Sequence, residues 1–368
     1  MCAPACLHWW RALTQAASRR EFVKGAVALP LVAAGCATSA ATDQAAGRAV
    51  LDDTLSIDVH THPALFQTYT RTTIDEHARA VEAGHVGGAF LAAVGDGAAL
   101  GHRPNGTPYA AREPGPGVLL NGAWRQLAVL DRHAGVLGMR IVLRASDIAV
   151  TAERHGRVAI MAVEGGDFLE GRLENVEQAY SRGVRSIQIV HYRVNELGDI
   201  QTEPPVHNRL TPFGRDVIRE MNRLGMLVDL AHAPLPVVKG AMDASTRPML
   251  VSHTNIEDYT GYARFVSREH ARLVASTGGV LGAWPISIRS ARFSTFIDHI
   301  KRMVDVVGVE HVAIGTDLAG VNPRSALFTD WAEWPSIPVA LLDRGFTRAD
   351  VAKIMGGNAR RLLEATLG

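Results

Sequence analysis

The stretch Leu55-Ser56-Ile57-Asp58-Val59-His60-Thr61-His62 decides the fold class, because a short apolar run here ends in metal-capable side chains. A run of this length and composition predicts a buried β-strand. His60 and His62 stand two residues apart, and side chains two apart on a strand project from the same face. Both imidazoles can therefore reach one metal ion, which predicts part of a metal site at the end of this strand.

Seven further runs of the same kind follow, and helical patterns separate them. Alternating strands and helices are typical of βα units that build a parallel sheet. Eight such strands predict one (β/α)8 TIM barrel, with residues 43–368 as a single domain. The predicted strands are Leu55–His62, Val86–Val94, Val158–Glu164, Val184–His191, Leu227–His232, Pro248–His253, Gly279–Trp284 and His311–Asp317.

The segments between the strands predict helices and two long loops. Gly84, Gly183, Gly225 and Gly308 are expected to end helices just before the next strand. The loops Gly95–Gly117 and Asn195–Asn208 are expected on the active-site face of the barrel. The expected helices are Thr72–Ala83, Leu173–Arg182, Thr211–Leu224, Ser267–Thr277 and Ser294–Val307.

The composition narrows the class of partner. The chain is 47% hydrophobic and 20% charged, so it can bury a large core. Its formal net charge of +1 gives no long-range field that would attract nucleic acid or an anionic membrane surface. We therefore expect a small-molecule partner. All three cysteines, Cys2, Cys6 and Cys36, precede the predicted barrel, so its metal ligands must be nitrogen or oxygen.

The first 42 residues are expected to form an export signal rather than part of the fold. Ser18–Lys24 contains the pair Arg19-Arg20 of a twin-arginine signal, and the uncharged run Gly25–Gly35 follows. Ala33-Ala34-Gly35-Cys36 is similar to a lipobox, although leucine is usual where Ala33 stands. We expect export to the bacterial periplasm or the cell envelope, either with a lipid on Cys36 or after cleavage behind Ala40. A chance basic pair before an apolar helix is the remaining reading.

Six of the eight predicted strands end in a side chain that can bind metal or transfer a proton. The carboxyl ends of barrel strands converge on one rim, so these side chains would gather around one mouth. Burying so many polar groups together without a metal would be costly. The residues are His60, His62, Glu164, His191, His232, His253 and Asp317.

These residues divide into two ion sites that share one carboxylate. Glu164 can bridge two cations and has room beside it, because Gly165 and Gly166 follow. His232 and His253, on neighbouring strands, would complete the second ion. A carboxylated lysine is the alternative bridge in barrel metallohydrolases. No lysine ends a predicted strand, since the chain has only Lys24, Lys239, Lys301 and Lys353.

The motifs together resemble the membrane (renal) dipeptidase family of zinc metallopeptidases, from about Ser56 to Leu363. The order and spacing of the pieces carry the resemblance, and no piece does so alone. They are Asp58-Val59-His60-Thr61-His62-Pro63, Val163-Glu164-Gly165-Gly166, Val228-Asp229-Leu230-Ala231-His232, Val251-Ser252-His253, Ile314-Gly315-Thr316-Asp317 and Gly356-Gly357-Asn358.

The resemblance implies an amidohydrolase-like barrel, two zinc ions, a dipeptide substrate and a homodimer. It assigns His60 and His62 to one zinc, His232 and His253 to the other, and Glu164 to both. It also implies that His191 contacts the scissile carbonyl and that Arg264 helps to hold the substrate. We expect Asp317 to accept the proton of the attacking water and pass it to the leaving amine.

Two departures from the family pattern keep other functions open. The usual first motif is His-x-Asp, but His62 is the second ligand here, which raises the positive charge of the site by one. The usual Asp-Phe-Asp-Gly is Asp317-Leu318-Ala319-Gly320. The alternatives are hydrolysis of another amide, an ester or a lactone, or an exported binding protein that has lost turnover.

Overall fold

The computed structural model describes residues 44–65, 72–104, 106–258, 261–288 and 291–367. The predicted export region, residues 1–42 with Cys36, lies outside the described residues. Among the helices that the structure describes, none has both the length and the apolar character needed to cross a membrane.

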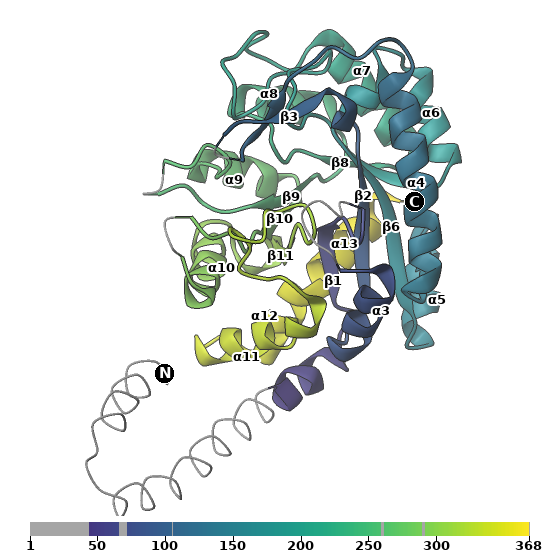
Figure 1. Cartoon of the computed structure of the whole chain (residues 1–368). Helices are drawn as coiled ribbons and strands as arrows, with labels where there is room; N and C mark the ends of the chain where they lie inside the picture. The colour runs from purple at the N-terminus through teal and green to yellow at the C-terminus, as the bar shows by residue number, and fades with distance from the viewer. Residues whose placement is uncertain (1–43, 66–71, 105, 259–260, 289–290, 368) are drawn as a thin grey trace, which may run out of the picture.

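Eight parallel strands close into a barrel with helices around it (Figure 1), which confirms the predicted fold class. The strands follow the chain around the barrel, and pairing between β2 and β6 closes it. The barrel strands are β1 (Ile57–Thr61), β2 (Gly88–Val94), β6 (Arg157–Glu164), β7 (Val184–Gln188), β8 (Leu227–Asp229), β9 (Leu250–Thr254), β10 (Val280–Ala283) and β11 (Val312–Ile314).

All five predicted helices are present, and the predicted glycines end them or follow the residue that does. Gly225, for example, caps its helix in the left-handed conformation at φ 72°, which glycine adopts without strain. The five helices are α3 (Ile74–Ala83), α6 (Glu174–Ser181), α7 (Pro212–Leu224), α9 (Arg268–Ser276) and α10 (Phe293–Val307).

The segment between β2 and β6 contains structure that the sequence pattern does not predict. The hairpin β3 (Leu100–His102) and β4 (Pro108–Ala110) lies in the expected loop Gly95–Gly117. A short strand, β5 (Met139–Ile141), pairs in parallel with the first three residues of β6. The segment also holds α4 (Val118–Val136) and α5 (Ala145–Glu153). Each of β3, β4 and β5 pairs with one strand only, and this pairing rather than a local pattern defines them.

Further helices follow β8 and occupy the C-terminal part of the chain. They are α8 (Leu235–Ala244), α11 (Ser336–Asp343), α12 (Arg348–Ala352) and α13 (Asn358–Thr366). Short helical turns are η1 (Gly97–Ala99), η2 (Gly166–Leu169), η3 (Val309–His311), η4 (Trp331–Glu333) and η5 (Lys353–Gly357).

Two apolar layers hold the barrel together. Alternate residues of β6, Val158, Ile160 and Ala162, belong to a cluster that joins seven barrel strands and α13. The intervening residues Ala159 and Met161 pack in a second cluster that includes the surrounding helices. Glu164 is the next residue of the first set, so the alternation of side chains along β6 places its carboxylate inside the barrel at the carboxyl end of the strand.

Several strands end earlier than the sequence predicts. His191, His232 and Asp317 each lie three residues beyond the last residue of their strand, not at its end. His232 and Asp317 have positive φ, 65° and 53°, which extended strand geometry does not allow. These side chains are therefore aimed by the first turn of a loop.

Candidate functional site

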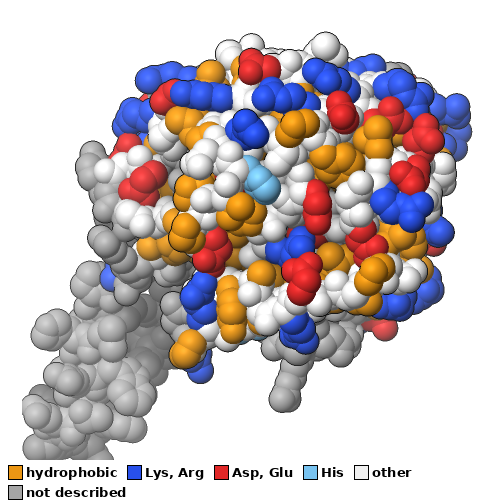
Figure 2. All heavy atoms as spheres, turned by 90° about the horizontal axis from the view of Figure 1, so that it is seen from above, with side chains coloured by type: hydrophobic (Ala, Val, Ile, Leu, Met, Phe, Trp, Pro, Cys, Tyr) orange, Lys and Arg blue, Asp and Glu red, His pale blue; other side chains and the backbone are white. Residues whose placement is uncertain are grey.

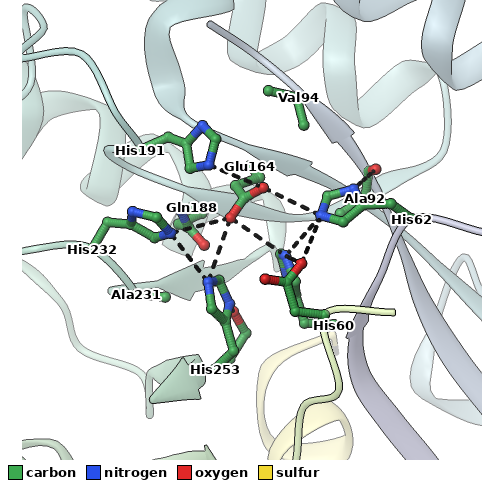
Figure 3. Close-up of polar contacts among 12 residues, drawn as sticks. His60, His62, Ala92, Val94, Glu164, Gln188, His191, Ala231, His232 and His253 are labelled. Carbon is green, nitrogen blue, oxygen red and sulfur yellow. Dashed lines mark hydrogen bonds and ion pairs between the residues drawn. The ribbon is translucent and has the colours of Figure 1, made fainter. Parts of the chain in front are cut away.

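Four histidines and one glutamate form two groups that share Glu164. His60, His62 and Glu164 make the first group, and Glu164, His232 and His253 make the second. Within each group the possible ligand atoms lie within 4.8 Å of one another, and all five residues are buried. Figure 3 shows the histidine rings arranged around the Glu164 carboxylate.

Each oxygen of Glu164 faces a different set of imidazoles. Oε1 lies 3.4 Å from His60 Nε2, 3.3 Å from His232 Nε2 and 3.6 Å from His253 Nε2. Oε2 lies 3.3 Å from His62 Nε2. Burial alone would raise the pKa of Glu164, but the charges of His191 and His60 and several hydrogen bonds hold it well below its usual range. The bridge is therefore an ionised carboxylate.

The donor atoms fit divalent metal ions. His60 Nε2 and His62 Nε2 are 3.1 Å apart, and so are His232 Nε2 and His253 Nε2, so each pair of nitrogens converges on one point. His62 Nδ1 donates to the Ala92 carbonyl at 2.8 Å, so Nε2 is the ring nitrogen turned toward Glu164. Burial holds the pKa of His232 and His253 well below the usual range, so both rings are neutral, as ligands must be. Imidazole nitrogens with one carboxylate suit a first-row transition metal or zinc.

Glycines make room for the acidic side chains. Gly165 has φ 92°, and a Cβ there would lie 3.1 Å from His191 Cβ and 3.1 Å from Asp167 Oδ2. A Cβ on Gly320 would lie 2.1 Å from Asp317 Oδ1. The Gly-Gly after Glu164 and the glycine three residues after Asp317 are therefore steric requirements of the site.

Asp317 lies beside the first histidine pair. Its Oδ1 is 3.4 Å from His62 Nε2 and 4.0 Å from His60 Nε2. The amide of Asp317 donates to the His60 carbonyl at 2.9 Å, which fixes the turn to β1. Its side chain is buried but lines the cavity described below, so it can meet a water or a substrate there.

His191 completes the ring of imidazoles on the other side of Glu164. Its Nε2 is 3.4 Å from Glu164 Oε2, and its Nδ1 contacts Asp96 Oδ1 at 2.7 Å. Burial alone would lower the pKa of His191, but the charges of Asp96 and Glu164 raise it to about 8.

The site opens into a cavity of about 360 Å³. The β3–β4 hairpin covers one side of it through Leu100, His102 and Gly106–Pro108. Aromatic and apolar walls come from Tyr192, Tyr262, Trp284 and Ile286. Figure 2 looks onto this end of the molecule, where basic, acidic and hydrophobic side chains are interspersed. The cavity has the size and lining of a small-molecule site.

Arg264 is placed differently from the other predicted residues, because it lies behind the cavity wall and is not among the lining residues. Its guanidinium carbon is 5.5 Å from the centre of the Trp284 ring. Nη1 donates to Gln201 Oε1, while Nε and Nη2 are buried and have no hydrogen-bond partner among the described residues. A buried guanidinium with open donors is a costly arrangement unless an anion approaches it.

Buried aspartates behind the ligands were not expected from the sequence. Asp58 Oδ1 accepts the Thr316 amide at 2.9 Å, and Oδ2 accepts Trp331 Nε1 at 3.0 Å. Asp229 Oδ1 accepts the amides of Ala231 and Ser252, both at 3.0 Å. The available signals were an aspartate two residues before His60 and one three residues before His232. For Asp96 the available signal was the sequence Gly95-Asp96-Gly97, which directly follows a predicted strand.

Comparisons with known proteins point to one family. Residues 44–367 match the family described as membrane dipeptidase (peptidase family M19). A dipeptidase of Claviceps purpurea is 31% identical over 255 residues, which cover 66% of this chain and 60% of that protein. An uncharacterized dipeptidase of Schizosaccharomyces pombe is 31% identical over 216 residues, covering 56% and 53%. The chain thus spans about three fifths or less of these relatives' lengths.

Solved structures share the fold. A metallopeptidase of Rhodobacter sphaeroides, liganded with a phosphinate mimic of the dipeptide L-Ala-D-Ala, has a TM-score of 0.74 at 19% identity, with 85% of this chain and 99% of that chain covered. A probable dipeptidase of Pseudomonas aeruginosa has a TM-score of 0.74 at 18% identity, with 89% and 98% covered. The expected metallo-dependent hydrolase type of barrel is thereby confirmed.

Proposed function

The chain belongs to the membrane dipeptidase family (peptidase family M19), and from that premise we propose that it is a zinc-dependent dipeptidase. The observation that carries the proposal is the Glu164 carboxylate between two histidine pairs at the base of a small cavity. The site is built to hold two cations next to a space for a short substrate.

Zinc is the metal that the donor set favours. Histidine nitrogen and carboxylate oxygen are its usual ligands in catalytic sites, and the described part of the chain offers no thiolate that would select another metal. When bound, two zinc ions would supply an activated water and polarise the substrate carbonyl. Because His62 stands where the family pattern usually has an aspartate, Glu164 is the one carboxylate in the two groups. The occupancy of both ion positions therefore has to be measured. Metal analysis of the purified protein tests this: about two zinc per chain is expected, and a metal-free active protein would contradict it.

Asp317 is the proposed base. Its carboxylate can accept the proton of the attacking water beside His60 and His62, and can return it to the leaving amine. The expected result for Asp317→Asn is a loss of turnover of about 100-fold or more, with the zinc content kept. Most of the turnover remaining at full zinc content would exclude this role.

His191 is proposed to face the carbonyl oxygen of the scissile bond. It lines the same cavity as Asp317, and its Nε2 points toward Glu164. An N–H at that position would stabilise negative charge that develops on the oxygen. We expect His191→Gln to lower kcat and to leave the zinc content unchanged.

Arg264 is proposed to bind the free carboxylate of the substrate. Its two open donors, Nε and Nη2, match the two oxygens of a carboxylate. Because the side chain lies behind Trp284, the role requires the aromatic wall to shift when substrate binds. Arg264→Met should weaken dipeptides and spare their C-terminal amides, with the exposed Arg268→Met as control. An equal loss of activity on the dipeptides and on their amides would contradict this role.

The substrate class is tested directly with a panel of L,L- and L,D-dipeptides, blocked amides, esters and lactones. A cavity of about 360 Å³ with one covered side favours the dipeptides. Preferred turnover of a lactone or ester by the zinc-loaded protein would replace this proposal with the alternative metallohydrolase.

Export is proposed on the sequence of residues 1–42 alone. Cell fractionation of the full chain, with Arg19→Lys and Arg20→Lys combined, tests the twin-arginine route. Cys36→Ala tests the lipid anchor, since it should move the protein from the membrane fraction to the soluble periplasm. Dimer formation, which the family resemblance implied, is checked by the mass of the protein in solution.

A further inference from the structure

Asp96 lies directly behind His191 and contacts two consecutive residues. The carboxylate is fully buried, with 0% of its surface exposed. Oδ1 lies 2.7 Å from His191 Nδ1, and Oδ2 accepts the backbone amide of Tyr192 at 3.0 Å. Asp96 comes two residues after the end of β2, whereas His191 comes three residues after β7. A single carboxylate therefore ties two distant loops together at the rim of the site.

The hydrogen-bond chemistry of this pair determines which ring nitrogen faces the cavity. An ionised carboxylate only accepts hydrogen bonds, so His191 Nδ1 carries the hydrogen. Nε2 is then the nitrogen turned toward Glu164 and the cavity. When Nε2 also carries a hydrogen, the Asp96 carboxylate balances the positive charge of the ring. The same division of labour is known from histidines oriented by a buried aspartate.

The neighbouring charged side chains have partners of their own, so His191 is the side-chain partner of Asp96. The neighbouring buried carboxylate, Asp167, has its own partners: Arg193 Nη1 at 3.2 Å and Asn195 Nδ2 at 3.0 Å. Gly165 lies between the two pairs without a side chain, which lets His191 approach. Two buried acids thus form two separate pairs, Asp167 with Arg193 and Asp96 with His191.

We propose that Asp96 is a positioning residue of the reaction: it holds His191 so that Nε2 points at the carbonyl oxygen of the substrate. This inference rests on the proposed function for its effect on rate. The hydrogen bond itself does not depend on that function, so the two can fail separately.

The test is Asp96→Asn in the zinc-loaded full chain. In asparagine an NH2 group replaces one of the two carboxylate oxygens, and each oxygen of Asp96 serves a different partner, so the variant can accept from His191 or from the Tyr192 amide but not from both. We expect kcat to fall about 10- to 100-fold, as for other residues that orient an active-site group, with KM and zinc content nearly unchanged. Asp147→Asn is the matched control, because Asp147 is also buried and accepts two backbone amides, at the start of α5. It should leave kcat unchanged.

A double-mutant cycle separates positioning from a general structural role. If Asp96 acts through His191, Asp96→Asn should cost nothing further in the His191→Gln background. The same loss in both backgrounds would overturn the proposal. So would a loss explained by reduced zinc content or by a lower unfolding midpoint alone.

A spectroscopic readout covers the case in which no dipeptide is hydrolysed. The Nδ1 hydrogen of His191, held by a buried carboxylate, should give a far-downfield proton resonance that Asp96→Asn and His191→Gln both remove. Absence of the resonance from the wild-type protein would overturn the proposal. Its presence without dipeptide turnover would contradict the proposed function instead.

Discussion

His270 makes the folded protein sensitive to acid at a point away from the metal ligands. It lies on α9, only 2% of its surface is exposed, and its Nε2 has no hydrogen-bond partner among the described residues. Burial, with a smaller contribution from the Arg264 charge, lowers the pKa of His270 from 6.5 to about 4. The folded protein therefore holds this ring neutral at a pH at which the unfolded chain protonates it.

The sign and size of the effect follow from this difference. Above pH 6.5 the ring is neutral in both states, so its contribution to the free energy of unfolding is fully present. As the pH falls from about 6.5 to about 4, only the unfolded state gains the proton, and unfolding becomes easier. At 1.36 kcal/mol per pH unit, the loss reaches about 3 kcal/mol near pH 4.

The assay compares His270→Leu with the wild type by urea unfolding between pH 4 and 7.5. Leucine fills the same space and cannot titrate. The free energy of unfolding of the variant, relative to that of the wild type, should therefore rise by about 3 kcal/mol as the pH is lowered from 7.5 to 4. Both proteins lose metal and protonate other groups alike, so the difference isolates His270. His155→Asn, at an exposed position, is the control for the loss of a histidine outside the core. A constant difference for His270→Leu would refute the reasoning.

Three further predictions concern the site. Removal of metal by a chelator should abolish turnover and lower the unfolding temperature, and added zinc should restore both; unchanged unfolding would contradict a metal that ties four strands together. Gly320→Ala should reduce kcat about 100-fold, because its Cβ would lie 2.1 Å from Asp317 Oδ1 and displace the base, whereas Gly122→Ala, with nothing within 4 Å, should not. Arg103→Ala should raise tripeptide relative to dipeptide hydrolysis, because it frees the β3–β4 hairpin from its ion pair with Glu203, and an unchanged ratio would show that the hairpin does not limit substrate length.

The barrel could be predicted because its signals are local. Apolar runs mark the strands, and glycines such as Gly225 end helices at positions that need positive φ. The short strand β5 could not, since its three residues are held by pairing with β6 rather than by their own pattern. The predicted strands extend too far along the chain for the same reason, because the turn that orients His232 depends on contacts made in the folded protein.

The types of site residue were predictable, but their geometry was not. The sequence named Glu164 as the shared carboxylate from its chemistry and its neighbours, and the structure brings the two histidine pairs to it. It could not show that Asp96 meets His191, because 95 residues separate them. Nor could it show that Arg264 lies behind Trp284, since the number of residues between His253 and Arg264 does not tell how deeply the side chain is buried.

The buried aspartates explain why the ligands stay in place although they stand on short strands and loops. Asp58 links β1 to the turn after β11 through the Thr316 amide, and so ties His60 to the segment that carries Asp317. Asp229 links the turn after β8 to β9, and so ties His232 to His253. Burial raises the pKa of Asp58 to about 6, despite the hydrogen bonds that lower it. Two nearby divalent cations would hold that carboxylate ionised, so metal binding and the cross-strand links should stabilise one another.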